Sequence, residues 1–228
     1  MNPGGNILVC FAVGEEAAPF RKFATNLPEV NILVTGMGKQ NAERSLRASL
    51  RNHRSALVLS CGFAGGLDPQ LTRGTVVFDA GDHPRLEAEL QKAGARRARF
   101  YCADRVAATA AEKRALREST RADAVEMESG VMRAVCAEQK IAFATVRVIL
   151  DPADEDLPLD FNRLLTPDQR MNYGRLAVVL AKAPGKIAGL RRLQRQSKIA
   201  AQTLARTLAG VAAGLPAGEQ RDGRSALS

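Results

Sequence analysis

The sequence lacks the features that mark membrane-spanning and secreted proteins. None of its apolar runs reaches the roughly 18 residues that a transmembrane helix needs. Its first residues, MNPGGNILVCFAVGEE, contain no basic segment and soon reach two glutamates, which is unlike a signal peptide. We therefore expect a cytoplasmic protein.

Cysteine, histidine and aromatic residues are also scarce. The four cysteines are far apart, no C-x-x-C occurs, and there are only two histidines. This pattern is typical of reduced thiols and disfavours a zinc site, so we predict that the protein binds no metal. Aromatic residues make up 4% of the chain, which leaves few side chains that could stack on a ligand.

Charge is the one unusual feature of the composition. The chain has 228 residues, 46% of them hydrophobic, which suits one globular domain with a sizeable core. Its net charge is +9, and the segment 186–206 contains six lysines or arginines and no acid. Such a block is typical of a solvated helix face, and contact with nucleic acid or an anionic membrane is the alternative.

Apolar runs alternate with helical patterns along the first two thirds of the chain. Runs rich in valine, isoleucine and leucine are typical of strands buried on both faces of a sheet. Helical spacing at 41–52 and 129–140 separates some of them. The alternation predicts an α/β fold with a central, largely parallel sheet between helices. The predicted strands are 6–13, 30–36, 55–62, 74–81, 98–103, 122–127 and 141–150.

Acids or glycines follow five of these strands. The segments are GEE (14–16), TGMGKQNA (35–42), SCGFAGGL (60–67), VEMES (125–129) and DPADED (151–156). Ligands in α/β folds gather at the carboxyl ends of strands, so these segments predict one site. Each signal alone is weak, because an acid after a strand is often a helix cap. The segment GMGKQN is no dinucleotide fingerprint, since asparagine stands in place of the third glycine.

Together, these segments resemble the nucleoside phosphorylase and nucleosidase superfamily, which includes methylthioadenosine/S-adenosylhomocysteine nucleosidase. The resemblance runs from about residue 7 to residue 155. It implies a three-layer fold with a mixed, twisted sheet, a homo-oligomer such as a dimer, and a small nucleoside rather than nucleic acid as ligand. The activity implied is cleavage of the N-glycosidic bond of an adenine-type purine nucleoside. No cofactor is implied, apart from inorganic phosphate as a co-substrate if the enzyme is a phosphorylase.

The resemblance assigns roles to three residues near the base and the ribose. Asp151 stands where the family has the aspartate that protonates or hydrogen-bonds purine N7. Glu128 stands where the family glutamate binds the ribose hydroxyls, with Met127 under the sugar and Glu126 as a second contact. The alternatives are a helix N-cap or an Asp-Pro turn for Asp151, a core position for Met127 and a first-turn helix acid for Glu128.

The nucleophile side of the expected site is less complete. Glu15 aligns with the glutamate that activates water in the nucleosidases, and Ser60 is expected in the same pocket. Phosphorylases have an arginine shortly before that serine, but this chain has ALVL (56–59), which favours hydrolysis. Val106 stands where the family has an aromatic residue that stacks on the base. The turn residues Phe63, Ala64 and Gly65 are further candidates for substrate binding.

Three features together resemble one branch of the superfamily, the hopanoid-associated phosphorylases, which implies an adenosylated hopane as substrate. They are the serine of VEMES, the short segment between GGL and RFYCADR, and the proline-containing basic helical tail. The basic segment could then lie on the inner face of the membrane, and packing as ordinary closing helices is the alternative. We expect one domain over 1–214, with basic closing helices at 186–214 and a disordered tail at 215–228. A different class of function is also consistent with the sequence, namely a non-catalytic protein that binds nucleotides, nucleic acid or membrane surfaces. Leu150 supports this class, because many nucleosidases have serine there.

Overall fold

The computed structural model describes residues 6–166, 168 and 172–215. One eight-stranded sheet organises the described chain, with the path β2-β1-β3-β8-β4-β5 and a side branch in which β7 joins β3 to β6. Two pairs, β3 with β7 and β4 with β8, are antiparallel, and the others are parallel. The sheet is therefore mixed and largely parallel, as predicted. The strands are β1 (Ile7–Phe11), β2 (Val30–Val34), β3 (Leu57–Gly66), β4 (Val76–Asp79), β5 (Arg96–Arg97), β6 (Phe100–Cys102), β7 (Ala124–Glu126) and β8 (Ala142–Asp151).

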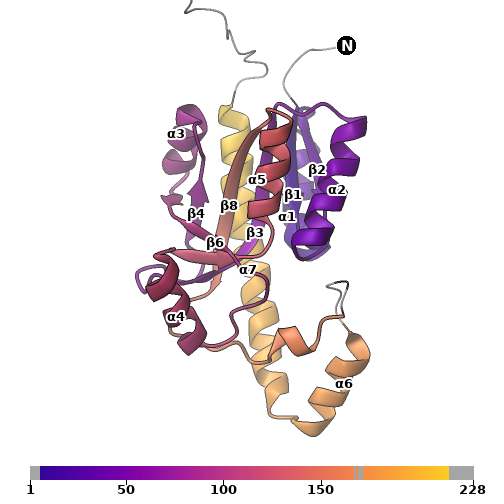
Figure 1. Cartoon of the computed structure of the whole chain (residues 1–228), viewed down its shortest axis with the longest axis vertical. Helices are drawn as coiled ribbons and strands as arrows, with labels where there is room; N and C mark the ends of the chain where they lie inside the picture. Colours follow the sequence, from indigo (N-terminus) through magenta and orange to yellow (C-terminus); the bar gives the residue numbers. More distant parts are fainter. Residues whose placement is uncertain (1–5, 167, 169–171, 216–228) are drawn as a thin grey trace, which may run out of the picture.

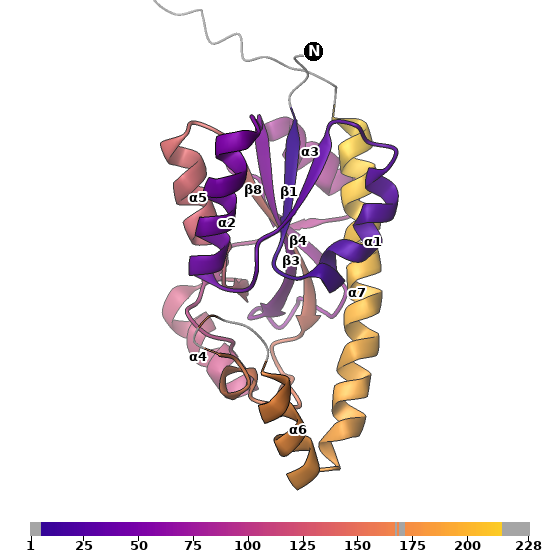
Figure 2. The ribbon, with the colours of Figure 1, turned by 90° about the vertical axis from the view of Figure 1, so that its right-hand side faces the viewer.

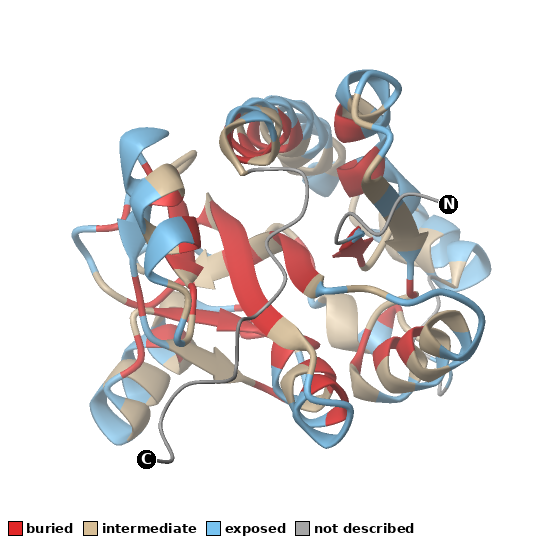
Figure 3. Ribbon diagram, turned by 90° about the horizontal axis from the view of Figure 1, so that it is seen from above, coloured by how far each residue is buried: buried red, intermediate tan, exposed pale blue. Residues whose placement is uncertain are grey.

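Helices cover both faces of this sheet, which makes three layers. In Figure 2, α2 and α5 lie on one side of the sheet, and α1 and α7 lie on the other. Seen from above, the central strands are buried and the outer faces of the helices are exposed (Figure 3). The helices are α1 (Gly14–Ala24), α2 (Lys39–Asn52), α3 (Pro84–Lys92), α4 (Ala110–Thr120), α5 (Ser129–Glu138), the 3-10 helix η1 (Phe161–Arg163), α6 (Tyr173–Lys182) and α7 (Lys186–Gly214).

The two longest strands carry the centre of the fold. β3 and β8 have ten residues each and pair in parallel, with a register shift between Ala64 and Gly65. Both are almost entirely buried, which is the pattern that a run of apolar residues predicts for a strand covered on both faces. Because their carboxyl ends reach past the end of β1, the residues that follow all three strands come together at one end of the sheet.

The segment 186–214, predicted as basic closing helices, is a single helix with two different surroundings. The second half of α7 packs on the sheet through residues such as Leu204 and Leu208, which are fully buried. Its first half extends with α6 beyond the sheet (Figure 1), and α6 has no buried residue. Apart from Leu215, the predicted tail at 215–228 lies outside the described residues. Within the described ranges, no helix combines the length and the apolar composition needed to cross a bilayer.

Candidate active site

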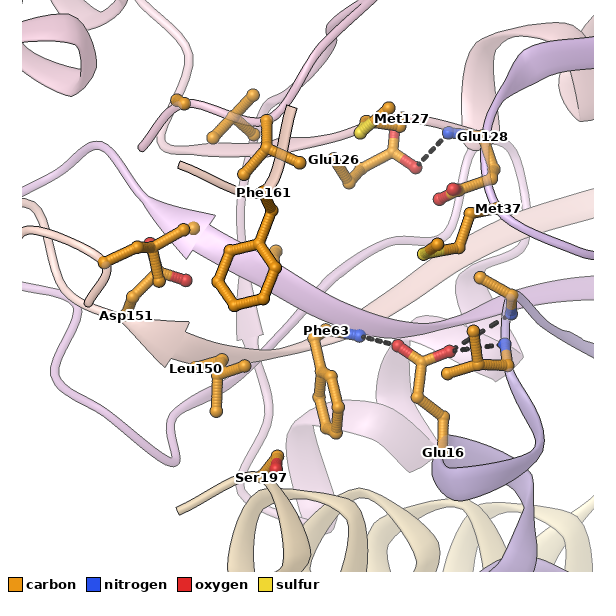
Figure 4. A pocket seen from close by; sticks show the side chains of 18 of the residues that line it. Glu16, Met37, Phe63, Glu126, Met127, Glu128, Leu150, Asp151, Phe161 and Ser197 are labelled. Atoms are coloured by element: carbon orange, nitrogen blue, oxygen red, sulfur yellow. Dashed lines mark hydrogen bonds between the residues drawn. The ribbon is translucent and has the colours of Figure 1, made fainter. Parts of the chain in front are cut away.

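A cavity of about 440 Å³ opens at the carboxyl ends of β1, β3, β7 and β8. This is the end of an α/β sheet where ligands bind. Nine of the ten residues predicted from the sequence line it, drawn from five separate segments of the chain, and Figure 4 labels five of the nine. They are Glu15, Phe63, Ala64, Gly65, Val106, Glu126, Met127, Glu128 and Asp151.

Ser60 is the exception among the predicted residues. It lies on β3 three residues before Phe63, and its side chain is buried below the cavity rather than in its wall. Its hydroxyl oxygen accepts a hydrogen bond from Nη2 of Arg147 at 3.0 Å. The expectation that Ser60 lines the pocket is therefore wrong, because β3 is still covered on both faces at this point.

The structure separates the two neighbouring glutamates at the start of α1. Glu15 is exposed, whereas Glu16 is only 5% exposed and faces the strand ends (Figure 4). As the third residue of the helix, Glu16 accepts hydrogen bonds from the backbone N–H groups of Ala12 (3.1 Å) and Val13 (3.2 Å). Its other oxygen accepts one from Phe63 N–H at 2.8 Å. The carboxylate fixed above the strand ends is thus that of Glu16, not of the predicted Glu15.

Glycine at position 62 is required for this arrangement. Gly62 has a φ of +147°, and a Cβ there would lie 2.7 Å from Oε1 of Glu16 and 2.8 Å from Nη1 of Arg147. A side chain would therefore displace both charged groups. Burial raises the pKa of Glu16 to about 7, although the nearby Arg147 opposes the shift. Near neutral pH, this carboxyl can take up or release a proton.

Arg147 links the two glutamates of the VEMES segment from below. It lies on β8, is 1% exposed, and donates to Glu126 at 2.6 Å and to Glu128 at 3.4 Å. Glu126 also accepts from the N–H groups of Glu128 and Ser129 and from the Ser129 hydroxyl, so it caps the start of α5. Although burial raises the pKa of Glu126, Arg147 and the bonds from Ser129 lower it overall.

Glu128 has fewer partners than Glu126. Its Oε1 accepts from the N–H of Gly38 at 2.9 Å, and its Oε2 makes only the longer contact with Arg147. Burial raises the pKa of Glu128, and the charge of Glu126 adds to the increase. In Figure 4 the Glu128 carboxylate lies near Met37. Of the two glutamates, Glu128 has a carboxylate oxygen that can accept further hydrogen bonds from a ligand. Glu126 mainly holds the backbone at the start of α5.

Asp151 ends β8 on the opposite side of the cavity. Burial raises its pKa to about 6, against the effect of Lys113, whose Nζ lies 2.5 Å from Oδ2 of Asp151. Phe161 extends into the space between Asp151 and Glu126 (Figure 4). It is held there by its neighbour Asn162, whose side chain exchanges two hydrogen bonds of 2.9 Å with the backbone of Val106. Phe161 thus supplies an aromatic ring beside the position where the sequence has valine.

Comparison with known proteins gives this arrangement a context. Residues 83–179 match the family model of the phosphorylase superfamily. Futalosine hydrolase of Helicobacter pylori is 17% identical, with a TM-score of 0.67 and coverage of 92% of this chain and 98% of that one. The 5'-methylthioadenosine/S-adenosylhomocysteine nucleosidase of Neisseria meningitidis, in complex with methylthio-immucillin-A, is 18% identical, with a TM-score of 0.69 and coverage of 92% and 99%. The corresponding nucleosidase of Colwellia psychrerythraea, in complex with adenine, is 16% identical, with a TM-score of 0.70 and coverage of 94% and 97%.

The chain has the fold of the phosphorylase superfamily. This confirms the resemblance drawn from the sequence and the predicted fold class. The matched residues 83–179 include Glu126, Glu128 and Asp151, and they also include Lys113 and Arg147, which the sequence analysis missed. The roles assigned to individual residues, the hopanoid branch and the absence of a metal stay predictions.

Proposed function

We propose that the protein is an enzyme that cleaves the N-glycosidic bond of an adenine-type purine nucleoside. The observation that carries this proposal is the presence of three buried carboxyl groups, those of Glu16, Glu128 and Asp151, around one largely apolar cavity. Breaking such a bond builds positive charge on the ribose and negative charge on the departing base. The reaction therefore needs three groups. They are a general acid near the purine, a carboxylate that binds the ribose hydroxyls, and a general base that activates the nucleophile.

The three carboxyl groups divide these tasks by position. Asp151 protonates the base, which lies against Phe161 and Phe63. Glu128 holds the ribose hydroxyls, and Met127 supplies an apolar surface under the sugar that excludes water and strengthens the nearby charge interactions. Glu16, held by three backbone N–H groups, orients the nucleophile.

Water is the proposed nucleophile, and no cofactor takes part. A phosphate anion needs positive charge that is not already neutralised. Of the described residues that line the cavity, only Arg105 is a cation, and it pairs with Glu112 at 2.7 Å. Arg147 beneath the cavity is shared between Glu126 and Glu128. Acids therefore dominate the described walls, and they disfavour a bound phosphate.

Incubation with methylthioadenosine or adenosine tests the activity directly. We expect adenine release that does not depend on phosphate, with a rate optimum between about pH 6 and pH 7. The optimum follows because Asp151, with a pKa of about 6, must carry a proton, while Glu16, with a pKa of about 7, must have lost one. If adenine release strictly required phosphate, the enzyme would be a phosphorylase and not a hydrolase. Binding without cleavage of any adenosine derivative, including a lipid-linked one, would favour the non-catalytic alternative.

The proposed substrate carries a substituent at its 5' position, either a thioether, as in methylthioadenosine and S-adenosylhomocysteine, or a lipid, as in adenosylhopane. An apolar substituent, such as the methylthio group or the lipid, suits this cavity best. Leu157, Leu165 and Leu193 continue the cavity wall towards α6 and α7. Near this end, α6 exposes Tyr173 (73% exposed) and Val178 (53%), and α7 carries exposed arginines and lysines. An exposed apolar and basic surface of this kind suits the anionic inner face of a membrane.

Vesicle sedimentation checks the membrane contact. We expect the protein to bind vesicles that contain phosphatidylglycerol and not vesicles of phosphatidylcholine alone. Changing Arg191, Arg192, Arg195 and Lys198 to glutamine should weaken this binding at least tenfold, because each basic residue near the surface contributes about 1 kcal/mol. The matched control changes four exposed cations in and after α3, Lys92, Arg96, Arg97 and Arg99, to glutamine. Equal binding by both variants would contradict the membrane contact. Sedimentation velocity of the wild type and the α7 variant would show whether these residues are needed for the predicted dimer instead.

A further inference from the structure

Lys113 is a fully buried lysine that none of the assigned roles uses. It lies on α4 and has an exposed fraction of 0%. Its Nζ contacts Oδ2 of Asp151 at 2.5 Å and donates to the carbonyl oxygens of Pro152 and Glu155, each at 2.8 Å. A buried ammonium group is costly unless it is paired and hydrogen-bonded, and this one is both.

The contacts of Lys113 all belong to the end of β8 and the loop that follows. The lysine therefore fixes both the backbone around Asp151 and one of its two carboxylate oxygens. Asp151 itself faces the cavity beside Phe161 (Figure 4), so its other oxygen remains for a ligand. A lysine that served only to join α4 to this loop would need the carbonyl contacts but not the carboxylate.

We propose that Lys113 is a positioning residue that sets the acidity of Asp151 for the reaction. This inference rests on the proposed function. When the Asp151 O–H bond breaks and an N–H bond forms at N7 of the purine, the electron pair of the glycosidic C–N bond passes to the base. Water bonds to the anomeric carbon in its place and gives a proton to Glu16. The carboxylate that remains on Asp151 is stabilised by the ammonium already bound to Oδ2, and Lys113 keeps its own protons throughout.

Two other charged groups face Asp151, and they act on its pKa in opposite directions. Arg73, before β4, lowers the pKa of Asp151, and Glu155, after β8, raises it. Arg73 donates both to the carbonyl oxygen of Leu150 and to the carboxylate of Glu155, so these opposite charges form their own pair. Among the charges that act on Asp151, Lys113 has the largest effect, and it opposes the increase that burial causes.

The test compares Lys113→Met with Arg117→Met. Arg117 lies one turn further along α4 and pairs with Asp68 and Asp123, so its loss removes ion pairs from the same helix without touching Asp151. In Lys113→Met, we expect the pKa of Asp151 to rise by roughly 1–3 units, the effect of an adjacent cation. The pH optimum of adenine release lies midway between the pKa values of Asp151 and Glu16, so it should move up by half as much, roughly 0.5–1.5 units. The maximal rate should fall about tenfold or more, because the new carboxylate has lost its fixed cation. In Arg117→Met, the optimum should not move.

A second measurement makes the result independent of turnover. The ¹³C chemical shift of the Asp151 carboxyl, assigned with Asp151→Asn, reports its titration in the wild type and in Lys113→Met or Lys113→Gln. We expect a higher pKa in either neutral variant, while Lys113→Arg restores the wild-type value. An unchanged pH optimum and an unchanged Asp151 titration would show that Lys113 only supports the loop. If no neutral variant folds, a wild-type Asp151 that titrates well above pH 7 would overturn the proposal. If the wild type releases no adenine, the proposed function fails, and the titration still decides the role of Lys113.

Discussion

Glu16→Gln is expected to lower the rate of adenine release by about 10²–10⁴-fold, the usual contribution of a general base. Glutamine has nearly the same shape, but it cannot accept a proton from water. Glu15→Gln is the matched control, because Glu15 is the adjacent residue and is exposed. We expect this control to keep most of the activity. The measurement is the initial rate of adenine release from methylthioadenosine by both variants at pH 6.5.

The pH dependence of unfolding provides an independent check on Glu16. Its pKa in the folded protein is raised from the ordinary value of 4.5 to about 7, so the folded state binds the proton more tightly than the unfolded state does. The free energy of unfolding therefore decreases as the pH rises from 4.5 to 7. In Glu16→Gln this component should be absent, and in Glu15→Gln it should be present. If adenine release were instead lost in Glu15→Gln and kept in Glu16→Gln, Glu15 would be the general base, as the sequence predicted.

Asp151→Asn is expected to reduce adenine release by about 10²–10⁴-fold, because asparagine cannot transfer a proton to the departing base. The same change leaves the ammonium of Lys113 buried without its carboxylate. Removing one partner of a buried ion pair typically costs about 3–5 kcal/mol of stability. We therefore expect the variant to be both inactive and easier to denature. Urea unfolding and the adenine assay on the same preparation measure the two effects.

The double variant Lys113→Met/Asp151→Asn separates these effects. Replacing the lysine as well removes the unpaired charge, so the double variant should regain part of the lost stability while staying inactive. A coupling energy of about 0.5–3 kcal/mol between two residues in contact is the expected range. If stability and activity returned together, the inactivity of Asp151→Asn would be a consequence of misfolding, and the assignment of Asp151 as the acid would fail.

Much of the architecture could be predicted from the sequence, because strands buried on both faces leave long apolar runs. All seven predicted strands occur, and only the two-residue β5 has no counterpart among them. The site could be located for a related reason, since five of these runs end in acids or glycines. What periodicity could not decide was which of two adjacent glutamates turns inwards at the start of α1. That choice depends on the backbone N–H groups of Ala12 and Val13, which follow β1, and of Phe63, which lies on β3.

The missed residues share one property, which is that their partners are distant in sequence. Arg147 lies within an apolar run, and a charge in a strand that is covered on both faces indicates a buried partner. That signal was present in TVRVIL (145–150). Lys113 gives no such signal, because its helix is otherwise polar and its partner lies 38 residues away. Phe161 follows the last predicted strand in a loop without periodicity, so its position depends on the contact between Asn162 and Val106.

The length of α7 has a mechanical consequence. With 29 residues it spans about 43 Å as one rod, at 1.5 Å for each residue. Its C-terminal half packs in the core, and its N-terminal end follows α6. Between these two parts, Leu193 and Ser197 contribute to the cavity wall. A displacement of the end of α7 that is joined to α6 would therefore move these two side chains in the cavity wall. If the proposed nucleoside binds in this cavity, contact of a surface with α6 would alter the shape of its binding site.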